Sequence, residues 1–268
     1  MDERPVSEFI EETPGIEIHQ EIESLKISLE IQKGNFEELQ SKHQEFRNFD
    51  ANDWGKTNQA ELIKQEYFRP FHNYVASIYT VIKHSQRIVD NFGGDDLYSE
   101  YTNEIVEMEL DELGEFLRQL RHYTQKRKVP PVETETTVSE TGLEFRLYIS
   151  KEQMLDWDEW NSDAKSYLES IPSRILLLDV IEEYQNRSEE FYDWFFRYIR
   201  FYFKDELEET LERIFFVETM KSSMPEPKIE KQREPFLHGY REKEVMQMPA
   251  IPMEYMHPYD PENILNGL

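Results

Sequence analysis

The sequence contains no cysteine, so disulfides, thiolate metal sites and cysteine nucleophiles are excluded. It also lacks any uncharged apolar run of about 18 residues, the length that a membrane-spanning helix requires. Its first residues, Met-Asp-Glu-Arg-Pro, have neither the basic nor the apolar region of a secretory signal. From these absences we expect a soluble, cytoplasmic protein with no membrane partner.

Motifs of several enzyme classes are missing as well. The chain has no Gly-rich phosphate loop, no His-x-x-x-His pair and no Gly-x-Ser-x-Gly turn, which leaves P-loop, zinc-protease and serine-hydrolase functions without support. Its one Glu-x-x-His pair, Glu254 and His257, lies among prolines and has no second copy, as a di-iron site would need. We therefore predict no metal site and no cofactor.

Positive charge is scarce, because 30 basic residues face 56 acidic ones and the formal net charge is -26. Such a surface repels polyphosphates, so binding of nucleic acid must depend on a local basic site or on high salt. The acidity is also typical of proteins from salt-loving organisms. However, 42 of the acids are Glu and lysine is as common as arginine, so composition leaves a halophilic source open.

Apolar residues recur at steps of three and four in several segments, which predicts long amphipathic helices. Gly93-Gly94 ends the second of these helices, and Pro130-Pro131 ends the third. A short helix is predicted as well, and the last long pattern extends to about Met220. The long stripes cover residues 18–46, 68–92, 106–120 and 177–202, and the short helix covers 161–170.

A different pattern precedes the short helix. Residues 143–149 alternate apolar and polar side chains behind a Thr-rich stretch, 134–138, and a turn at 139–142, which predicts a small β-hairpin. The fold class is therefore mainly α: a helical bundle of four to five long helices with a small β-hairpin insert and a Pro/Met-rich C-terminal tail. Nine of the thirteen residues from Phe191 to Phe203 are aromatic, so we expect several elements to pack around them.

The domain organisation follows from where the periodicity begins and ends. Residues 1–15 are acidic and aperiodic, and we interpret them as a lead-in to the fold. Residues 16–222 form a single predicted helical domain. Residues 223–268 are rich in Pro, Met and Glu, and we interpret them as an extended tail, whose segment Met246 to Tyr259 is a candidate to dock on a protein partner or back onto the bundle.

The third helix ends in a basic island, residues 118–128, with five Lys or Arg and no acid. Mutual repulsion means that the island needs an acidic partner within the fold or an anion from outside. Helical spacing places four polar residues of the island on one face: Arg118, Arg121, His122 and Gln125. His84 and Arg87 of the second helix meet this face if the two helices pack antiparallel. A pair of solvated helix edges is the simpler alternative. The candidate binding residues are Arg118, Arg127, Lys128, His84, Arg87 and Gln125, with Arg121 and His122 between them.

Several short strings resemble those of a known group. Leu120-Arg121-His122-Tyr123-Thr124-Gln125-Lys126 followed by Val129-Pro130-Pro131 resembles the Leu-Arg-Asn-Tyr-x-x-His and Leu-Pro-Pro element of a group of bacterial and archaeal helical proteins in the HEPN superfamily. Phe71-His72-Asn73-Tyr74 and His84-Ser85-Gln86-Arg87 are similar to two further stretches of that group. The resemblance covers roughly residues 60 to 220.

The resemblance implies a helical bundle, commonly a dimer, with a metal-independent RNase cleft in which an arginine and a histidine act together. Arg121 matches the arginine, whereas Lys126 stands where the family has its histidine. Because lysine keeps its proton near neutral pH, proton exchange at this position is lost. The resemblance thus implies an RNA or nucleotide cleft with degenerate RNase activity, in the defence or toxin–antitoxin settings associated with the superfamily. Arg121, Lys126 and His122 are its candidate catalytic residues.

Two alternatives remain open. One is an active RNase that uses His84 or His122 for proton transfer. The other is an acidic helical interaction protein, in which the aromatic helix and the Met/Pro-rich tail bind a protein and no nucleic acid takes part.

Overall fold

The computed structural model describes residues 15–47, 59–126, 132–139 and 142–221, and within these residues the chain is mainly α, as predicted. Residues 14–204 belong to one compact unit, and the helix that follows belongs to another.

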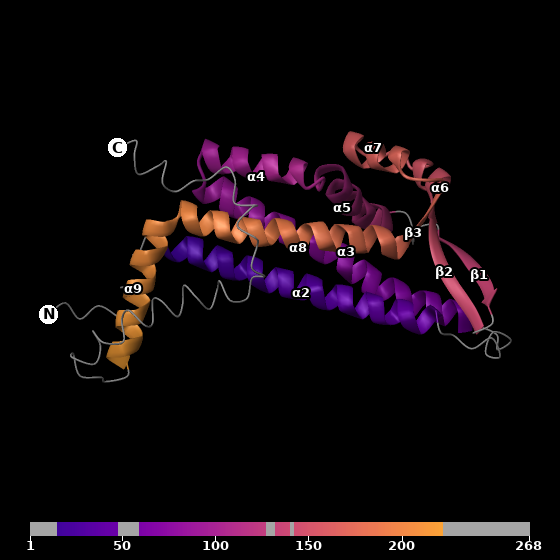
Figure 1. Cartoon of the computed structure of the whole chain (residues 1–268), viewed down its shortest axis with the longest axis horizontal. Coiled ribbons are helices and arrows are strands. Elements are labelled where there is room, and N and C mark those ends of the chain that lie inside the picture. Colours follow the sequence, from indigo (N-terminus) through magenta and orange to yellow (C-terminus); the bar gives the residue numbers. More distant parts are fainter. Residues whose placement is uncertain (1–14, 48–58, 127–131, 140–141, 222–268) are drawn as a thin grey trace. The chain divides into compact units, whose positions relative to one another are not determined.

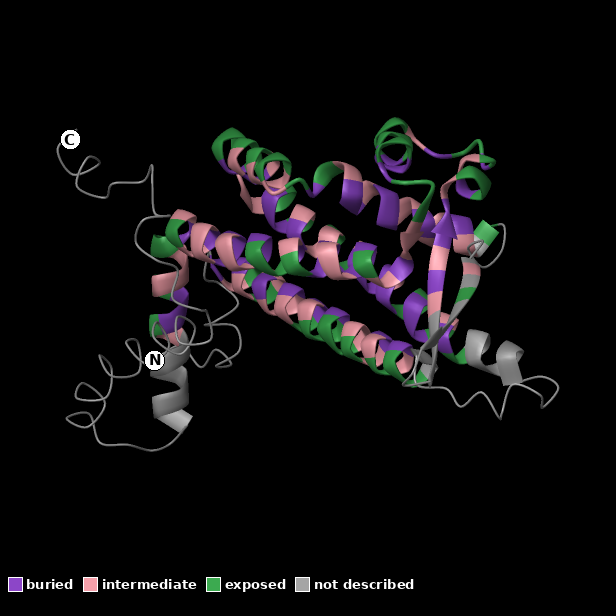
Figure 2. Ribbon diagram, turned by 45° about the vertical axis from the view of Figure 1, so that its right-hand side comes forward, coloured by how far each residue is buried: buried purple, intermediate pink, exposed green. Residues whose placement is uncertain are grey.

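Three long helices form the body of the larger unit. They are α2 (Ile16–Arg47), α3 (Gln59–Phe92) and α8 (Leu177–Tyr202). α2 and α3 pack together along their lengths and α8 contacts α2 (Figure 1). The predicted stripes are confirmed as core: Leu25 on α2, Val75 on α3 and Ile181 on α8 are fully buried. Figure 2 shows buried positions, in purple, spaced along the long helices.

The predicted third helix is in fact two helices, so that prediction was wrong in its N-terminal part. α4 (Asp95–Glu107) and α5 (Asp111–Lys126) are separated at Glu109, whose φ of 52° lies in the left-handed region. A residue in that conformation interrupts the helical hydrogen bonds. Val106 consequently lies 59% exposed near the end of α4, while α5 packs against α3 and α7.

The hairpin prediction is confirmed, and the structure adds a strand to it. β1 (Val132–Ser139) pairs antiparallel with β2 (Gly142–Ser150), and the register joins Ser139 to Gly142. The short strand β3 (Arg174–Leu176) pairs with the other edge of β2. Three residues carry too little pattern to identify a strand from sequence. β2 also contacts α2 and α8, and its Leu147 and Ile149 are buried.

Two short helices follow the hairpin: α6 (Lys151–Leu155), which the sequence did not indicate, and the predicted α7 (Ser162–Ser170). The Asn161 side chain caps α7 by accepting a hydrogen bond from the backbone N–H of Ala164 at 3.0 Å. Trp160 donates its indole N–H to the carbonyl of Met154 at 2.7 Å, which holds the connection between α6 and α7.

The aromatic helix α8 is shorter than predicted. Phe203 adopts φ -103° and ψ 28°, outside the α-helical region, so α8 ends at Tyr202 and a separate helix, α9 (Lys204–Lys221), follows. The break coincides with the boundary between the two compact units, inside the predicted single domain. The expected packing of the aromatic stretch is seen, because Phe191 and Phe195 lie 5.5 and 5.4 Å from the Tyr101 ring. Among the described helices, none has the length and apolarity needed to cross a membrane.

Candidate functional site

One cation of α5 and one of α3 lie over a tyrosine ring of α3. The guanidinium carbon of Arg121 lies 4.4 Å from the centroid of the Tyr79 ring, and the Lys83 Nζ lies 5.9 Å from the same centroid. These are cation–π geometries. We call Lys83, Arg118, Arg121 and His122, with Tyr79 between them, the basic strip. Within the described part of the chain, no carboxylate is within ion-pair distance of Arg121 or Lys83.

Arg118 has the acidic partner that the crowded cations require. Its Nε donates to one oxygen of Glu115 at 2.6 Å, and its terminal nitrogen donates to the other. Glu115 accepts further hydrogen bonds from Gln119 at 3.0 Å and from Asn161. Burial raises the pKa of the Glu115 carboxyl, but these donors outweigh burial, and the net shift of its pKa is downward. Glu115 is therefore ionised and neutralises Arg118.

Lys126 is directed to a different neighbour from Arg121. Its Nζ donates to Glu159, in the connection between α6 and α7, at 2.6 Å. The Lys126 and Glu159 side chains are 59% and 52% exposed, so the ion pair is solvent-screened and weak. The two residues of the family pattern thus have different neighbours, Glu159 for Lys126 and the Tyr79 ring for Arg121.

His122 lies in the basic strip and is half-buried. Burial lowers the pKa of its imidazole, and the neighbouring positive charges of Arg121, Arg118 and Lys126 lower it further. The ring is therefore neutral near pH 7. An anion bound among these cations would reverse part of this shift, because it would stabilise the charged imidazolium.

The prediction that His84 and Arg87 meet the basic face of α5 was wrong, because both residues face α2. The His84 Nδ1 lies 2.9 Å from the hydroxyl of Ser28 and 3.1 Å from the carbonyl of Ser24, and Arg87 pairs with Glu21. His84 follows Tyr79 by five residues, which corresponds to about 140° around the axis of α3. The side chain of Gln125 and the whole of Arg127 and Lys128 lie outside the described residues.

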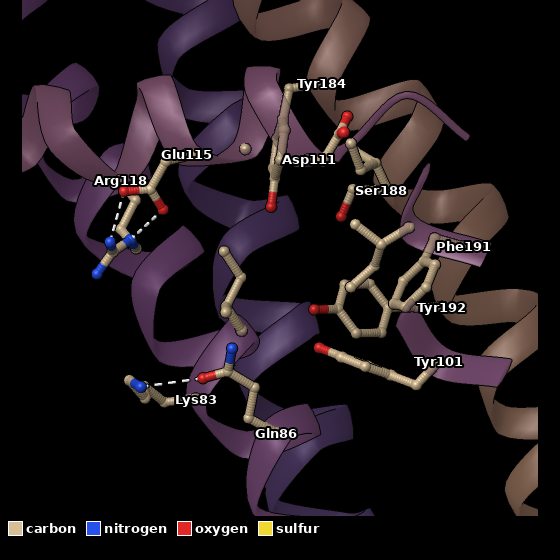
Figure 3. A pocket seen from close by; sticks show the side chains of 14 residues that line it. Lys83, Gln86, Tyr101, Asp111, Glu115, Arg118, Tyr184, Ser188, Phe191 and Tyr192 are labelled. Carbon is tan, nitrogen blue, oxygen red and sulfur yellow. Dashed lines mark hydrogen bonds and ion pairs between the residues drawn. The ribbon is translucent and has the colours of Figure 1, made fainter. Parts of the chain in front are cut away.

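A pocket of about 330 Å³ lies beside the basic strip, between α3, α4, α5 and α8. Figure 3 shows that the hydroxyls of Tyr101, Tyr184 and Tyr192 point into it, and that Lys83 and Arg118 lie together at one side of it. The tyrosines are buried, whereas Lys83 is exposed and Arg118 half-buried, so the cations belong to the rim. No pattern in the sequence predicted the pocket, because its walls come from four separate helices.

Besides its charged lining residues, the pocket contains a group of uncharged hydroxyls. The Ser85 hydroxyl lies 2.9 Å from the Tyr101 hydroxyl and 3.3 Å from that of Tyr192. Burial raises the pKa of Tyr101 to about 12 and raises those of Tyr184 and Tyr192 well above the ordinary value. All three phenols therefore keep their protons at neutral pH and can both donate and accept hydrogen bonds.

Among the described residues, no cluster of three or more His, Asp or Glu could hold a metal ion. Comparisons with family models, with curated proteins and with solved structures found no match to this chain. The candidate site is consequently defined by its own geometry: an arginine over a tyrosine ring, a neutral histidine beside it and a hydroxyl-lined pocket that shares its rim.

Proposed function

We propose that the chain binds RNA through the basic strip and that its RNase activity is degenerate. The observation that supports this most directly is Arg121, whose guanidinium lies over Tyr79 while no described carboxylate pairs with it. A guanidinium that is held in place without an acidic partner can donate two hydrogen bonds to a phosphate. Single-stranded nucleic acids bind where cations and aromatic rings lie side by side, as Arg121 and Tyr79 do here.

Because the whole chain is acidic, RNA can contact it favourably only at the basic strip. The basic strip must attract phosphate within a protein of net charge -26, so only the phosphates nearest to Arg121 and Lys83 contribute favourably. We therefore expect few phosphate contacts and a shallow dependence on salt compared with proteins that carry a broad basic surface.

Degenerate cleavage is supported by the positions of the candidate proton-transfer groups. Metal-independent cleavage needs groups that give and take protons near the scissile phosphate. Lys126 is paired with Glu159, and His84 faces α2. Among the described candidates, His122 alone remains beside Arg121, with a lowered pKa that suits a base and not an acid.

A protein-interaction role is the second candidate, and one surface feature favours it. Ile27 and Ile31 lie one turn apart on α2 and are 57% and 56% exposed. The homodimer that the HEPN resemblance implies stays a prediction. A protein partner of the C-terminal tail, which lies outside the described residues, stays a prediction too.

Binding of a fluorescent single-stranded RNA at about 50 and 200 mM salt tests the proposal. We expect Arg121→Ala to weaken binding about tenfold, as expected for the loss of a charge-assisted contact. Arg69→Ala is the matched control, because Arg69 is an exposed arginine of the same helix as Tyr79 and is paired with Glu38. Equal affinities for the wild type and Arg121→Ala would overturn RNA binding by the strip and favour the protein-interaction role.

Cleavage of the same RNA without metal tests the degenerate activity. We expect little or no cleavage by the wild type and increased cleavage by Lys126→His, which restores the histidine of the family pattern. Efficient cleavage by the wild type that disappears in both Arg121→Ala and His122→Gln would instead identify an active RNase that uses His122.

A further inference from the structure

We propose that the tyrosine-lined pocket binds the base of a nucleotide whose phosphate lies at Lys83 and Arg121 in the basic strip. The inference rests on the proposed function for the phosphate and adds to it a site for one base. A ligand of this class has a planar, neutral, hydrogen-bonding part and an anionic part, and the pocket and the strip match these two parts separately.

The pocket and the strip are continuous. Lys83 lines the pocket and also lies over the Tyr79 ring, whose other cationic neighbour is Arg121. Arg118 lines the pocket as well and is neutralised by Glu115. An anion at the rim therefore meets Lys83 and Arg121 as the cations without a described acidic partner.

The interior suits a neutral heterocycle. Figure 3 shows the Tyr101, Tyr184, Tyr192 and Ser188 hydroxyls directed into the pocket. Because the tyrosines stay protonated, they can match the mixed donors and acceptors on the edge of a base. Apolar side chains complete the wall, among them Ile82 and Phe191. The ionised Glu115 also lines the pocket and would repel an anion placed deep in it, so the anion stays at the rim.

The rim also orients the ligand. Asp111 lies on the other side of the pocket from Lys83 and Arg118 (Figure 3). Its carboxylate repels a phosphate, so the anionic end is directed towards Lys83. The volume of about 330 Å³ lies at the lower end of the range for ligand pockets. A pocket of this size can hold one base and its sugar but not a second nucleotide.

The test is calorimetric titration of the full chain with AMP, UMP, adenosine and inorganic phosphate. We expect both mononucleotides to bind more tightly than adenosine or phosphate alone. Tyr184→Phe and Tyr192→Phe each remove one hydroxyl and should weaken AMP binding about threefold to tenfold, the range for one lost hydrogen bond. Tyr74→Phe is the matched control, because Tyr74 is equally buried but donates to Gln185 outside the pocket.

The outcomes separate this inference from the proposed function. If Arg121→Ala weakens RNA binding while Tyr184→Phe and Tyr192→Phe bind AMP like the wild type, the base pocket is wrong and the RNA-binding strip stands. If AMP binds no more tightly than adenosine, the placement of the phosphate is wrong. If Tyr184→Phe and Tyr192→Phe weaken AMP binding while Arg121→Ala leaves the affinity for RNA unchanged, the pocket binds a mononucleotide and the proposed RNA function is wrong.

Discussion

The two sides of α5 carry opposite kinds of chemistry. On one side, Phe116 stacks on Tyr167 with ring centroids 5.0 Å apart, and Tyr123 stacks on Trp160 at 5.8 Å with the ring planes 7° apart. On the other side, Arg121 lies over Tyr79, and the pocket opens beside Arg118. The aromatic side is closed by residues 37 to 51 positions later in the chain, because Trp160 covers Tyr123 and Tyr167 covers Phe116. On the basic side, Arg121 and Lys83 have no described acidic partner.

This contrast shows where stability and function divide within one helix. A buried aromatic pair stabilises the fold through the area that it removes from water, and it leaves no group for a ligand. A guanidinium held over a ring by a cation–π contact stabilises little and keeps its hydrogen-bond donors available. We therefore expect substitutions on the aromatic side to change stability, and substitutions on the basic side to change binding.

The largest effect is expected for Phe116→Ala. Phe116 is fully buried, and its removal should lower the free energy of unfolding by about 3–5 kcal/mol, because it loses buried area and leaves a cavity. Denaturant unfolding followed by circular dichroism measures this loss. Phe201→Ala is the control, since Phe201 is 60% exposed, and a loss no larger than that of the control would contradict the contrast.

Glu115→Gln should affect both sides at once. Glu115 joins Arg118 to Asn161 at the start of α7, so neutralising it leaves a half-buried guanidinium without its carboxylate. We expect the free energy of unfolding to fall by about 1–3 kcal/mol. RNA should bind more tightly, because Arg118 is released for phosphate. Glu190→Gln, at an exposed position of α8, removes the same charge as a control. Weaker RNA binding by Glu115→Gln would argue against an anion site here.

A smaller effect, of opposite sign, is expected for Gly114→Ala on α5. A Cβ at Gly114 would make only an ordinary contact, 3.5 Å from Tyr184, and glycine is unfavourable within a helix. The free energy of unfolding should rise by about 0.5–1 kcal/mol. Gly93→Ala provides the contrast, because a Cβ there would lie 2.6 Å from the carbonyl of Val89. Thermal unfolding of both variants tests the pair, and a loss in Gly114→Ala would mean that the helix is more tightly packed at this point.

The smallest effect concerns the pH dependence that His122 contributes. Its pKa is lowered in the folded state, so below the ordinary value of 6.5 the unfolded chain takes up the proton more readily. Stability is therefore lost as pH falls below about 6.5, and His122→Gln should make that loss less steep. Unfolding measured between about pH 7.5 and 5 in both proteins tests this. An RNA phosphate in the strip should raise the pKa of His122, which an NMR titration of its ring proton would detect.

Much of the fold could be predicted from the sequence because its signals are local. The apolar stripes of α2, α3 and α8 follow helical spacing, and the alternation along β2 indicated the hairpin. The break at Glu109 and the end of α8 at Phe203 were missed, since neither position carries a glycine or proline. Neither β3 nor α6 is long enough for a period to show.

The candidate site was predictable only in part. The basic island correctly marked Arg121 as a cation of interest, but its neighbours could not be assigned. His84 and Arg87 lie one turn apart on α3 and close in sequence to Lys83, yet they contact Ser28 and Glu21 of α2. A helix of unknown rotation can present either edge to a given neighbour, so spacing along one helix cannot select its partner.

The sequence by itself determined the mainly α class, the hairpin and the concentration of basic residues near the end of α5, because each depends on residues within a few turns of one another. Tertiary structure decided where the other cations lie: Lys126 pairs with Glu159 and Arg121 lies over Tyr79, whereas the pair of Glu115 and Arg118 is local to one turn of α5. It also brought the hydroxyls of α4 and α8 into one pocket. Electrostatic and hydrogen-bond partners depend on distances in space, and the packing of the helices sets those distances.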